Sequence, residues 1–379
     1  MGEHALLSAS SAHRWLVCTR APRLEETLPE TESGYANEGR LAHAIAELRL
    51  KKQYTPMKKS EFEKKLNELK SDPLFTNEMM NYIDVYVDYI NSITYSFTNQ
   101  PYIAIEKRLD YSDYAPEGFG TGDCIIINNN ELYIIDFKYG KGVPVSAEKN
   151  PQMMLYALGA CSESSFLFNI ELVKMIIVQP RIDNISIYTM QIDELLAWGE
   201  SIKPIAQKAY NGEGKFVIGE HCRFCRAKAL CRARAEFNTS IDTSKSPELL
   251  TDEEIGQILT KAQDIKAWVS DLEEYALGAI LNGKMIPGWK VVEGRSTRQF
   301  ADTDKAFEIL KQNGIDEAVL YERKPVTLTQ VEKLLSKSKF AELLSEYVIR
   351  PEGKPTLVPE SDKREPLKRP GALDDFGNL

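Results

Sequence analysis

The stretch YIIDFKYGKG (133–142) joins an apolar strand to a pair of charged side chains. Residues 133–135 have the apolar character of a strand in the core of a sheet. Asp136 and Lys138 follow, two residues apart, before the first glycine. Because side chains alternate between the two faces of a strand, Asp136 and Lys138 lie on the same face. The stretch therefore predicts a core strand that holds a carboxylate and an ammonium group side by side at its end.

The residues before this strand predict a β-hairpin. Residues 123–128 and 131–138 have strand character, and the three asparagines at 128–130 are typical of a turn. This hairpin brings Asp123, at the start of one strand, close to Asp136. Two carboxylates forced together repel each other unless a cation lies between them. Oxygen ligands suit Mg²⁺ or Mn²⁺, so the hairpin predicts a divalent metal site.

Two acids and a lysine at one end of a sheet suit metal-assisted phosphodiester hydrolysis. A lysine at this place can hold or deprotonate an attacking water, and it can balance charge on a phosphate in the transition state. The alternative for Asp136 and Lys138 is an ordinary salt bridge at a strand end. Further residues along the chain favour the hydrolytic site.

The periodicity of apolar residues up to about residue 210 predicts an α/β fold. The expected order is helices, three strands, a helix, two strands and a helix. Asp193 is expected to be the N-cap of the last of these helices. The stretches with helical pattern are 33–50, 74–97, 150–162 and 193–210, and those with strand pattern are 100–111, 123–128, 131–138, 171–180 and 184–192.

Four residues outside the hairpin have the spacing of a catalytic set. Glu106, on the strand before the hairpin, offers a third carboxylate. His43 lies on the first helix of the predicted core. Gln152 and Tyr156 are spaced i, i+4 on the helix that follows the catalytic strand, so they share one face. Core packing or a surface position is the simpler interpretation of each residue taken alone.

In their order along the chain, these motifs resemble the RecB-type branch of the PD-(D/E)XK nucleases. The matching motifs are G-x-x-x-H (39–43), Glu106, G-x-G-D (120–123), I-D-F-K (135–138) and Q-x-x-x-Y (152–156). The resemblance implies a PD-(D/E)XK restriction-endonuclease-like core, with a central mixed sheet flanked by helices. An N-terminal helical segment and a mainly helical C-terminal extension are expected around this core.

The same resemblance implies a Mg²⁺- or Mn²⁺-dependent deoxyribonuclease and a role for each motif residue. His43, Asp123 and Asp136 are expected to bind the metal, and Lys138 is expected to be catalytic. The remaining expected site residues are the catalytic acid Glu106 and the two residues that line the DNA site, Gln152 and Tyr156.

Three of the six cysteines form a C-x₂-C-x₅-C pattern in a basic segment: Cys222, Cys225 and Cys231. Neighbouring arginines favour thiolates by lowering the pKa of a thiol. A tetrahedral metal or a cubane cluster needs a fourth ligand, for which Cys18 is the best candidate. The other two cysteines are expected in apolar structural positions. The spacing alone allows either a Cys₄ zinc site or a [4Fe–4S] cluster.

One distant cysteine followed by this pattern resembles the iron–sulfur nucleases, which include AddB-type nuclease domains and the RecB-like exonucleases associated with CRISPR systems. The resemblance implies a structural [4Fe–4S] cluster, with Zn²⁺ as the alternative. The opening SASSAHRWLVC (8–18) and the ending GKPTLVPESDKRE (353–365) resemble a family of phage and prophage proteins. That analogy implies an exonuclease of phage recombination, with a single-strand annealing or single-strand binding protein as partner.

Length and composition set the limits of these predictions. The 379 residues are 43% apolar and suffice for two or three domains. We expect a RecB-like nuclease core with the cysteine site at 1–238 and a mainly helical domain at 239–350. An extended or disordered tail is expected at 351–379, where proline and charged residues are frequent.

The net charge of −9, taken alone, disfavours DNA as a partner. Residues 221–234, however, carry five Arg or Lys and no acid, and local patches decide phosphate binding. The sequence has no run of 18 apolar residues and no secretory signal pattern, which predicts a cytoplasmic protein without a membrane partner. The oligomeric state stays open.

Two other functions remain open from the residues alone. One is a catalytically inactive DNA-binding or assembly protein on a nuclease fold, and the other is an iron–sulfur redox protein. All the acids of the motif set are present, which favours an active nuclease. The phage analogy favours an exonuclease over an endonuclease.

Overall fold

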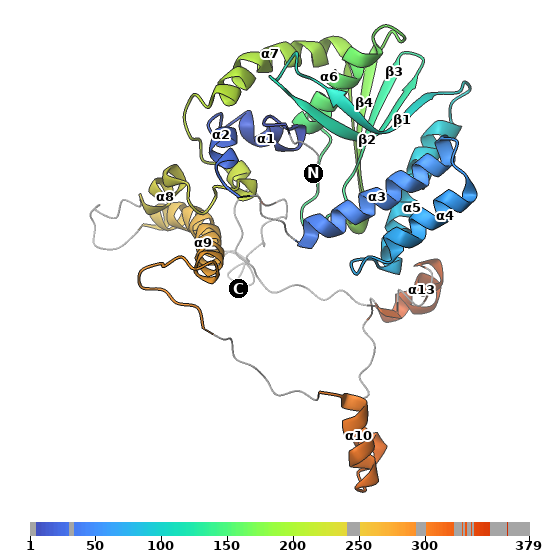
Figure 1. Ribbon diagram of the computed structural model, residues 1–379, viewed down its shortest axis with the longest axis vertical. Coiled ribbons are helices and arrows are strands. Elements are labelled where there is room, and N and C mark those ends of the chain that lie inside the picture. Colours follow the sequence, from blue (N-terminus) through green and yellow to red (C-terminus); the bar gives the residue numbers. More distant parts are fainter. Residues whose placement is uncertain are drawn as a thin grey trace, which may run out of the picture. The chain divides into compact units, whose positions relative to one another are not determined.

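In the computed structural model, a five-stranded sheet with the strand order β1-β2-β3-β4-β5 forms the centre of the fold. The strands are β1 (Tyr102–Asp110), β2 (Phe119–Asn128), β3 (Glu131–Phe137), β4 (Leu172–Gln179) and β5 (Asn184–Gln191). Neighbouring strands are antiparallel except for β3 and β4, which are parallel. Helices flank this mixed sheet (Figure 1), so the prediction of an α/β fold is confirmed.

The structure describes residues 5–29, 34–240, 251–292 and 301–321, and beyond them residues 328, 330–331, 335, 337–348 and 362. The chain divides into two compact units, Met1–Gly278 and Ala279–Leu379. Their boundary lies inside α9 (Asp252–Leu281), whereas the boundary predicted from the sequence is residue 238. Apart from Asp362, the predicted tail lies outside the described residues.

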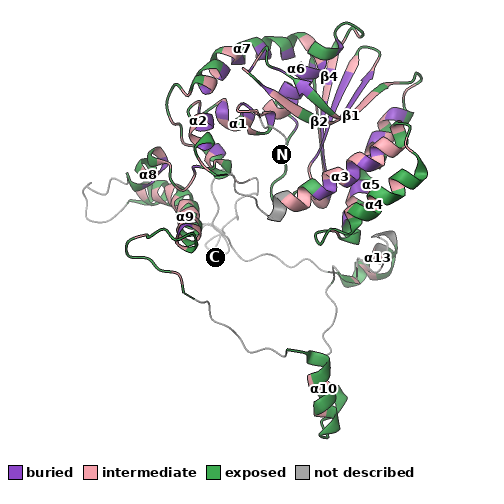
Figure 2. Ribbon diagram, in the orientation of Figure 1, coloured by how far each residue is buried: buried purple, intermediate pink, exposed green. Residues whose placement is uncertain are grey.

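The two faces of the sheet pack on different helices. Ile125, Ile134 and Ile177 belong to a core shared with α6 (Pro151–Ser164) and α7 (Ile192–Asn211). The residues that alternate with them, such as Ile126 and Ile135, pack against α3 (Gly34–Tyr54) and α5 (Asn77–Tyr95). Figure 2 shows buried residues along the strands and on the helix surfaces that cover them. The central strands β2, β3 and β4 are therefore buried on both faces, as their continuous apolar runs predict.

The hairpin turn is shorter than predicted. Asn128 pairs with Glu131, which leaves Asn129 and Asn130 as a two-residue turn. Asn129 has a φ of 53°, a left-handed conformation that asparagine tolerates and tight hairpins require. Strand β2 begins at Phe119, so the prediction that Asp123 starts this strand is wrong. Asp123 lies in its middle because the glycines before it continue the pairing with β1.

Helix α7 begins earlier than predicted. It starts at Ile192, and Gln191 and Glu194 form a capping box at its N-terminus. The prediction that Asp193 is the N-cap is therefore wrong. Strand β5 runs directly into the helix, so the last strand residue, Gln191, becomes the cap. Asp193 lies in the first turn, where a negative charge interacts favourably with the helix dipole.

The remaining described elements are helical. No helix among the described residues is long and apolar enough to cross a membrane. In the first unit they are η1 (Ala9–Ser11), α1 (Ala12–Trp15), α2 (Ala21–Glu26), α4 (Lys59–Lys70), η2 (Pro180–Ile182), η3 (Glu220–Phe224) and α8 (Arg232–Thr239). In the second unit they are α10 (Thr303–Gln312), α11 (Glu317–Leu320), α13 (Lys337–Leu344) and η4 (Ser345–Tyr347).

Candidate functional site

Three acids lie in one row across the first three strands. Ile105 pairs with Cys124 and Lys107 with Gly122, so Glu106 on β1 lies opposite Asp123 on β2. Cys124 pairs with Ile135, so continuing this register places Asp136 of β3 opposite Asp123. Like charges directly opposite each other destabilise a sheet. The row therefore lowers the stability of the folded sheet unless cations lie beside it.

Asp136 is buried and forms an ion pair with Lys138, as the strand alternation predicts. Its side chain is only 5% exposed, and Lys138 Nζ lies 3.0 Å from Asp136 Oδ2. Burial raises the pKa of Asp136, and the charge of Lys138 offsets this only in part. Burial lowers the pKa of Lys138, but Asp136 and Asp123 raise it more, so the ammonium group stays charged.

One oxygen of Asp136 has no hydrogen-bond donor. Oδ2 is buried and accepts no hydrogen bond among the described residues, although Lys138 approaches it closely as an ion-pair partner. A buried carboxylate oxygen without a directed donor costs free energy. The ammonium group of Lys138 is therefore the charged partner of this oxygen.

Gln152 connects the charged pair to helix α6. Its Nε2 donates to Asp136 Oδ1 at 3.2 Å, and its Oε1 accepts from Lys138 Nζ at 3.1 Å. Nε2 also lies 3.4 Å from the hydroxyl of Tyr156, so the predicted shared face of Gln152 and Tyr156 is confirmed. A Cβ at Gly120 would lie 2.7 Å from the Tyr156 ring. Glycine at position 120 is therefore what lets Tyr156 approach β2.

Asp123 joins the other members of the site. Its Oδ2 accepts a hydrogen bond from Phe137 N at 2.7 Å, and its Oδ1 lies 3.4 Å from Nδ1 of His43 on α3. Burial lowers the pKa of His43, but Asp123, Asp136 and Glu106 together raise it more, to about 9. Without a metal, His43 is therefore a protonated partner of the acid row.

Glu106 has a backbone conformation that is unusual for a strand. Its φ is 50°, in the left-handed region that non-glycine residues rarely adopt and that often accompanies functional sites. Burial raises the pKa of Glu106 to about 7, and Asp123 contributes to the shift. The carboxylate is therefore held where negative charge is already concentrated.

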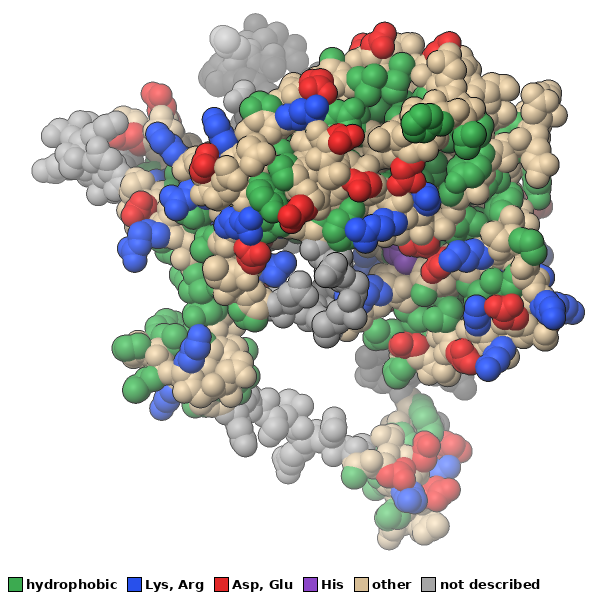
Figure 3. All heavy atoms as spheres, turned by 45° about the horizontal axis from the view of Figure 1, so that its top comes forward, with side chains coloured by type: hydrophobic (Ala, Val, Ile, Leu, Met, Phe, Trp, Pro, Cys, Tyr) green, Lys and Arg blue, Asp and Glu red, His purple; other side chains and the backbone are tan. Residues whose placement is uncertain are grey.

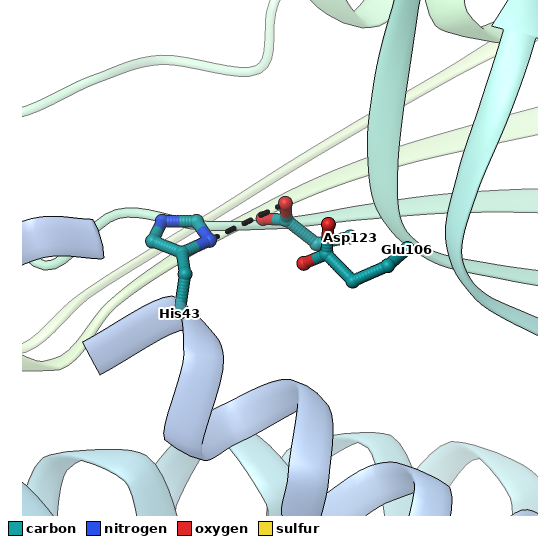
Figure 4. Close-up of side chains that lie close together, drawn as sticks. All are labelled: His43, Glu106 and Asp123. Atoms are coloured by element: carbon teal, nitrogen blue, oxygen red, sulfur yellow. Dashed lines mark ion pairs between the residues drawn. The ribbon is translucent and has the colours of Figure 1, made fainter. Parts of the chain in front are cut away.

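His43, Glu106 and Asp123 can hold a metal ion. Their ligand atoms lie within 4.8 Å of one another, and no other such group of three or more His, Cys, Asp or Glu occurs among the described residues. In Figure 4, His43 points from α3 toward Asp123, with Glu106 beside it. One imidazole nitrogen and two carboxylates suit Mn²⁺, and the carboxylates also suit Mg²⁺. A pocket of about 500 Å³ lined by His43 and Glu106 gives access.

This group differs from the metal ligands predicted from the sequence, which were His43, Asp123 and Asp136. The structure places Asp136 next to Lys138 and Gln152, and Glu106 is the third member of the close group. Alternation along β3 indicates the position of Asp136. The backbone conformation that sets the position of Glu106 depends on the folded sheet and has no signal in the sequence.

The structure brings together the four cysteines of the predicted cluster. Cys18, Cys222, Cys225 and Cys231 line one small pocket. Val217 links two of them, because its N–H donates to Cys18 Sγ at 3.5 Å and its carbonyl lies 3.9 Å from Cys222 Sγ. Burial raises the pKa of the Cys18 thiol, and it raises that of Cys225 to about 12. Without a metal, these two thiols are therefore protonated.

The four sulfurs are spread out around this pocket. Among the described residues, no three cysteine sulfurs lie within 4.8 Å of one another. Four thiolates on a tetrahedral zinc ion with Zn–S bonds of about 2.3 Å have sulfurs roughly 3.8 Å apart. The sulfurs around this pocket thus lie farther apart than the four sulfurs bound to one zinc ion. Cys124 and Cys161 pack in the two apolar cores instead, as expected.

A buried ion pair that sequence reasoning missed holds the cysteine segment. Glu25 is 5% exposed. It accepts hydrogen bonds from Arg14 Nε at 2.8 Å and from the backbone N–H of Arg226 at 2.7 Å. Arg14 also donates to the carbonyl oxygen of Phe224 at 2.9 Å. Glu25 and Arg14 contact residues about two hundred positions away, and contacts at this separation have no signal in the local sequence.

Gln179 was also missed, and it fixes the loop after Lys138. It is buried at the end of β4 and donates to the carbonyl oxygens of Gly140 and Val143 at 2.7 and 3.0 Å. Its Oε1 accepts from Val145 N and from Asn184 Nδ2, both at 3.1 Å. The Gln179 side chain thus makes the hydrogen bonds to the loop backbone that a neighbouring strand would make in a sheet.

Comparison with solved structures gives one described as the crystal structure of SSO0001, with 15% sequence identity. The match covers 57% of this chain and 95% of that chain, with a TM-score of 0.25. A score this low supports no conclusion about the fold or function. Residues 4–365 match the family described as protein of unknown function, DUF2800. Because this match spans almost the whole chain, the protein belongs to the DUF2800 family.

Proposed function

We propose that the protein is a Mg²⁺- or Mn²⁺-dependent deoxyribonuclease with a PD-(D/E)XK core. We further propose that it is an exonuclease of phage-type DNA recombination or processing. One observation carries the proposal: the Asp136–Lys138–Gln152 network shares Asp136 with the acid row that His43 joins. The mixed sheet with helices on both faces is compatible with this core.

Each side chain of the site has a role in this proposal. His43, Glu106 and Asp123 hold the cation, and Asp136 holds Lys138 beside it. When bound, the cation polarises a phosphate and lowers the pKa of water.

The charged Lys138 balances negative charge that develops on the phosphate. Gln152 fixes the orientation of Lys138 and Asp136 through its two hydrogen bonds, and Tyr156 supports Gln152. A charge that is positioned in advance needs no reorganisation during the reaction, which is why such networks accelerate hydrolysis.

We also propose a [4Fe–4S] cluster at Cys18, Cys222, Cys225 and Cys231, with Zn²⁺ as the alternative. A cubane cluster spreads its four cysteines over four irons, so their sulfurs lie farther apart than on a single ion. The wide spacing of the thiols supports the larger group. Iron, acid-labile sulfide and zinc contents of anaerobically purified protein decide between the two.

The test is a cleavage assay with anaerobically purified protein and Mn²⁺ or Mg²⁺. The substrates are end-labelled linear duplex, single-stranded and closed circular DNA. Asp136→Ala is the inactive variant, and Asp113→Ala is the matched control because Asp113 is exposed outside the site. We expect wild type and the control to degrade linear DNA, circles to survive, and Asp136→Ala to be inert.

Other results change the conclusion in defined ways. Nicking of closed circles identifies an endonuclease and weakens the recombination analogy. If linear DNA stays intact at high enzyme excess while the metal cluster is present, the proposal of nuclease activity is overturned. The inactive DNA-binding or assembly protein then becomes the leading interpretation.

A further inference from the structure

One side of helix α9 carries exposed apolar side chains. Ala279 is the one buried residue that the structure describes in this helix. Ile255, Leu259, Val269 and Leu277 are 42, 45, 43 and 49% exposed. Apolar side chains also lie between Lys, Arg, Asp and Glu on the face drawn in Figure 3, so exposure alone does not identify a binding surface. The spacing of the residues along α9 is more informative.

Side chains along α9 form a stripe with the spacing of a coiled coil. Steps of four and three residues alternate along it, and this average of 3.5 residues keeps the stripe on one side of the helix. The stripe consists of Ile255, Leu259, Ala262, Lys266, Val269, Glu273 and Ala276. At 1.5 Å per residue it is about 32 Å long. A stripe of this kind packs along the matching stripe of another helix.

A different side of α9 fastens the helix to the cysteine segment. Asp271 forms ion pairs with Lys228 at 2.8 Å and with Arg234. Trp268 Nε1 donates to a backbone carbonyl oxygen of the same segment at 3.4 Å. Around the helix, Asp271 points about 160° away from Val269, and Trp268 points about 100° away from it. These contacts therefore hold α9 in place while Val269 stays exposed.

Two opposite charges interrupt the apolar stripe. Lys266 and Glu273 are exposed, and neither forms an ion pair with another residue that the structure describes. They lie seven residues apart, about 10 Å along the axis, so they do not pair within the helix. A charge in the seam of a coiled coil lowers its stability unless the partner helix offers an opposite charge. The best partner for α9 therefore presents the same two charges in the reverse order.

A second copy of this chain meets that requirement when the two α9 helices are antiparallel. With a two-fold axis near Val269, Lys266 of each copy lies within about one helical turn of Glu273 of the other copy. The same arrangement places the large Leu259 of one copy beside the small Ala276 of the other. Parallel helices would instead place lysine beside lysine and glutamate beside glutamate.

We propose that the protein forms a homodimer in which the stripes of two antiparallel α9 helices pack together. The interface is self-complementary, so each contact occurs twice and each substitution acts twice. This inference does not depend on the proposed nuclease activity. It assigns α9 the role of a dimerisation helix that the cysteine segment holds in place.

Sedimentation velocity of full-length holo-protein between about 1 and 100 μM tests the proposal. We expect wild type to change from monomer to dimer over this range. Lys266→Glu and Glu273→Lys should each weaken dimerisation about 5- to 50-fold, because each turns two attractive pairs into two repulsive ones. The double variant Lys266→Glu/Glu273→Lys restores both pairs with exchanged signs. Its dimerisation should return to within about threefold of wild type.

Two further variants keep the result specific. Glu274→Lys is the matched control, because Glu274 is exposed and points about 100° away from Glu273, and it should leave dimerisation unchanged. Val269→Asp places a charge at the centre of the interface and should abolish the dimer. Circular dichroism of all variants should match wild type, since the substituted side chains are exposed.

Three results overturn the proposal. The first is a wild type that stays monomeric at about 100 μM. The second is a dimer whose stability does not change in Lys266→Glu, because parallel helices or another surface would then form the contact. The third is a double variant that stays as weak as the single variants. None of these results depends on DNA cleavage, so the dimer and the nuclease are tested separately.

Discussion

The acid row and the cysteine pocket differ in how closely their side chains contact one another. Around Asp136, three side chains already form a hydrogen-bonded network anchored on a strand and a helix. The four cysteines line a pocket built from loops and short helical turns, and their sulfurs are not drawn together. Regular secondary structure thus brings the polar side chains around Asp136 into hydrogen-bond contact, whereas the loops and turns that carry the cysteines place the thiols around a wider space.

The largest effect on the acid row is expected when the charge of Asp136 is removed. Asp136→Asn keeps the shape but leaves Lys138 without its anionic partner. We expect DNA cleavage to fall about 10³-fold or more, because both charge balance and lysine orientation are lost. Rates on linear DNA, with Asp113→Asn as the control, measure the effect.

Circular dichroism of the same variants separates catalysis from folding. We expect Asp136→Asn to keep its secondary structure, since removing one charge from the acid row offsets part of the lost ion pair. Unfolding of this variant would mean that the network is structural and that the catalytic assignment is unsupported.

The cysteine pocket should respond in the opposite manner, through stability. We expect Cys18→Ser to lose bound iron or zinc and to lower the unfolding temperature by several degrees, since a metal closing a long loop stabilises the native state. Differential scanning fluorimetry and metal analysis of holo-protein measure both effects. Cys161→Ser is the matched control, because Cys161 packs against an apolar core. Equal metal content in the two variants would contradict the cysteine site.

The third prediction separates the metal ligands suggested by sequence and by structure. If Glu106 is the third ligand, Glu106→Gln weakens Mn²⁺ binding about 10- to 100-fold, and Asp136→Asn weakens it less. Glu47→Gln is the control, since Glu47 lines the same pocket and pairs with Lys51. Calorimetric titration measures the three affinities. A larger loss in Asp136→Asn than in Glu106→Gln would restore Asp136 as the ligand.

Metal binding should also depend on pH. His43 and Glu106 must lose protons to bind a cation, and their pKa values are raised to about 9 and about 7. Mn²⁺ affinity should therefore rise about tenfold per pH unit between about 7 and 9, where only His43 still has to lose a proton, and more steeply below pH 7. Titration at three pH values, beside the His43→Ala variant, measures it. A flat profile would show that neither group loses a proton on binding.

Metal-free protein should show the opposite trend in stability. The folded-state pKa of His43 lies above its ordinary value of 6.5, so its stabilising contribution is present below pH 6.5 and is lost as the pH rises toward 9. The raised pKa of Glu106 acts in the same direction, because its ionisation in the folded state is unfavourable.

Strand alternation predicted Asp136 and Lys138 on one face, and helical spacing did the same for Gln152 and Tyr156. Such short-range patterns follow from backbone geometry. The close grouping of Glu106 with His43 and Asp123 and the Glu25–Arg14 contact to the cysteine segment could not be predicted in this way. Both depend on segments that meet only after folding, and Asp193 was misplaced because a strand passes directly into its helix.

The left-handed backbone at Glu106 has a consequence for how this protein can change. Glycine at this position would relieve the conformational strain and remove one charge from the acid row. A selection for thermal stability alone should therefore favour replacement of Glu106, while a selection for metal-dependent activity should retain it. If Glu106 binds a metal, position 106 is thus a point where stability and activity oppose each other.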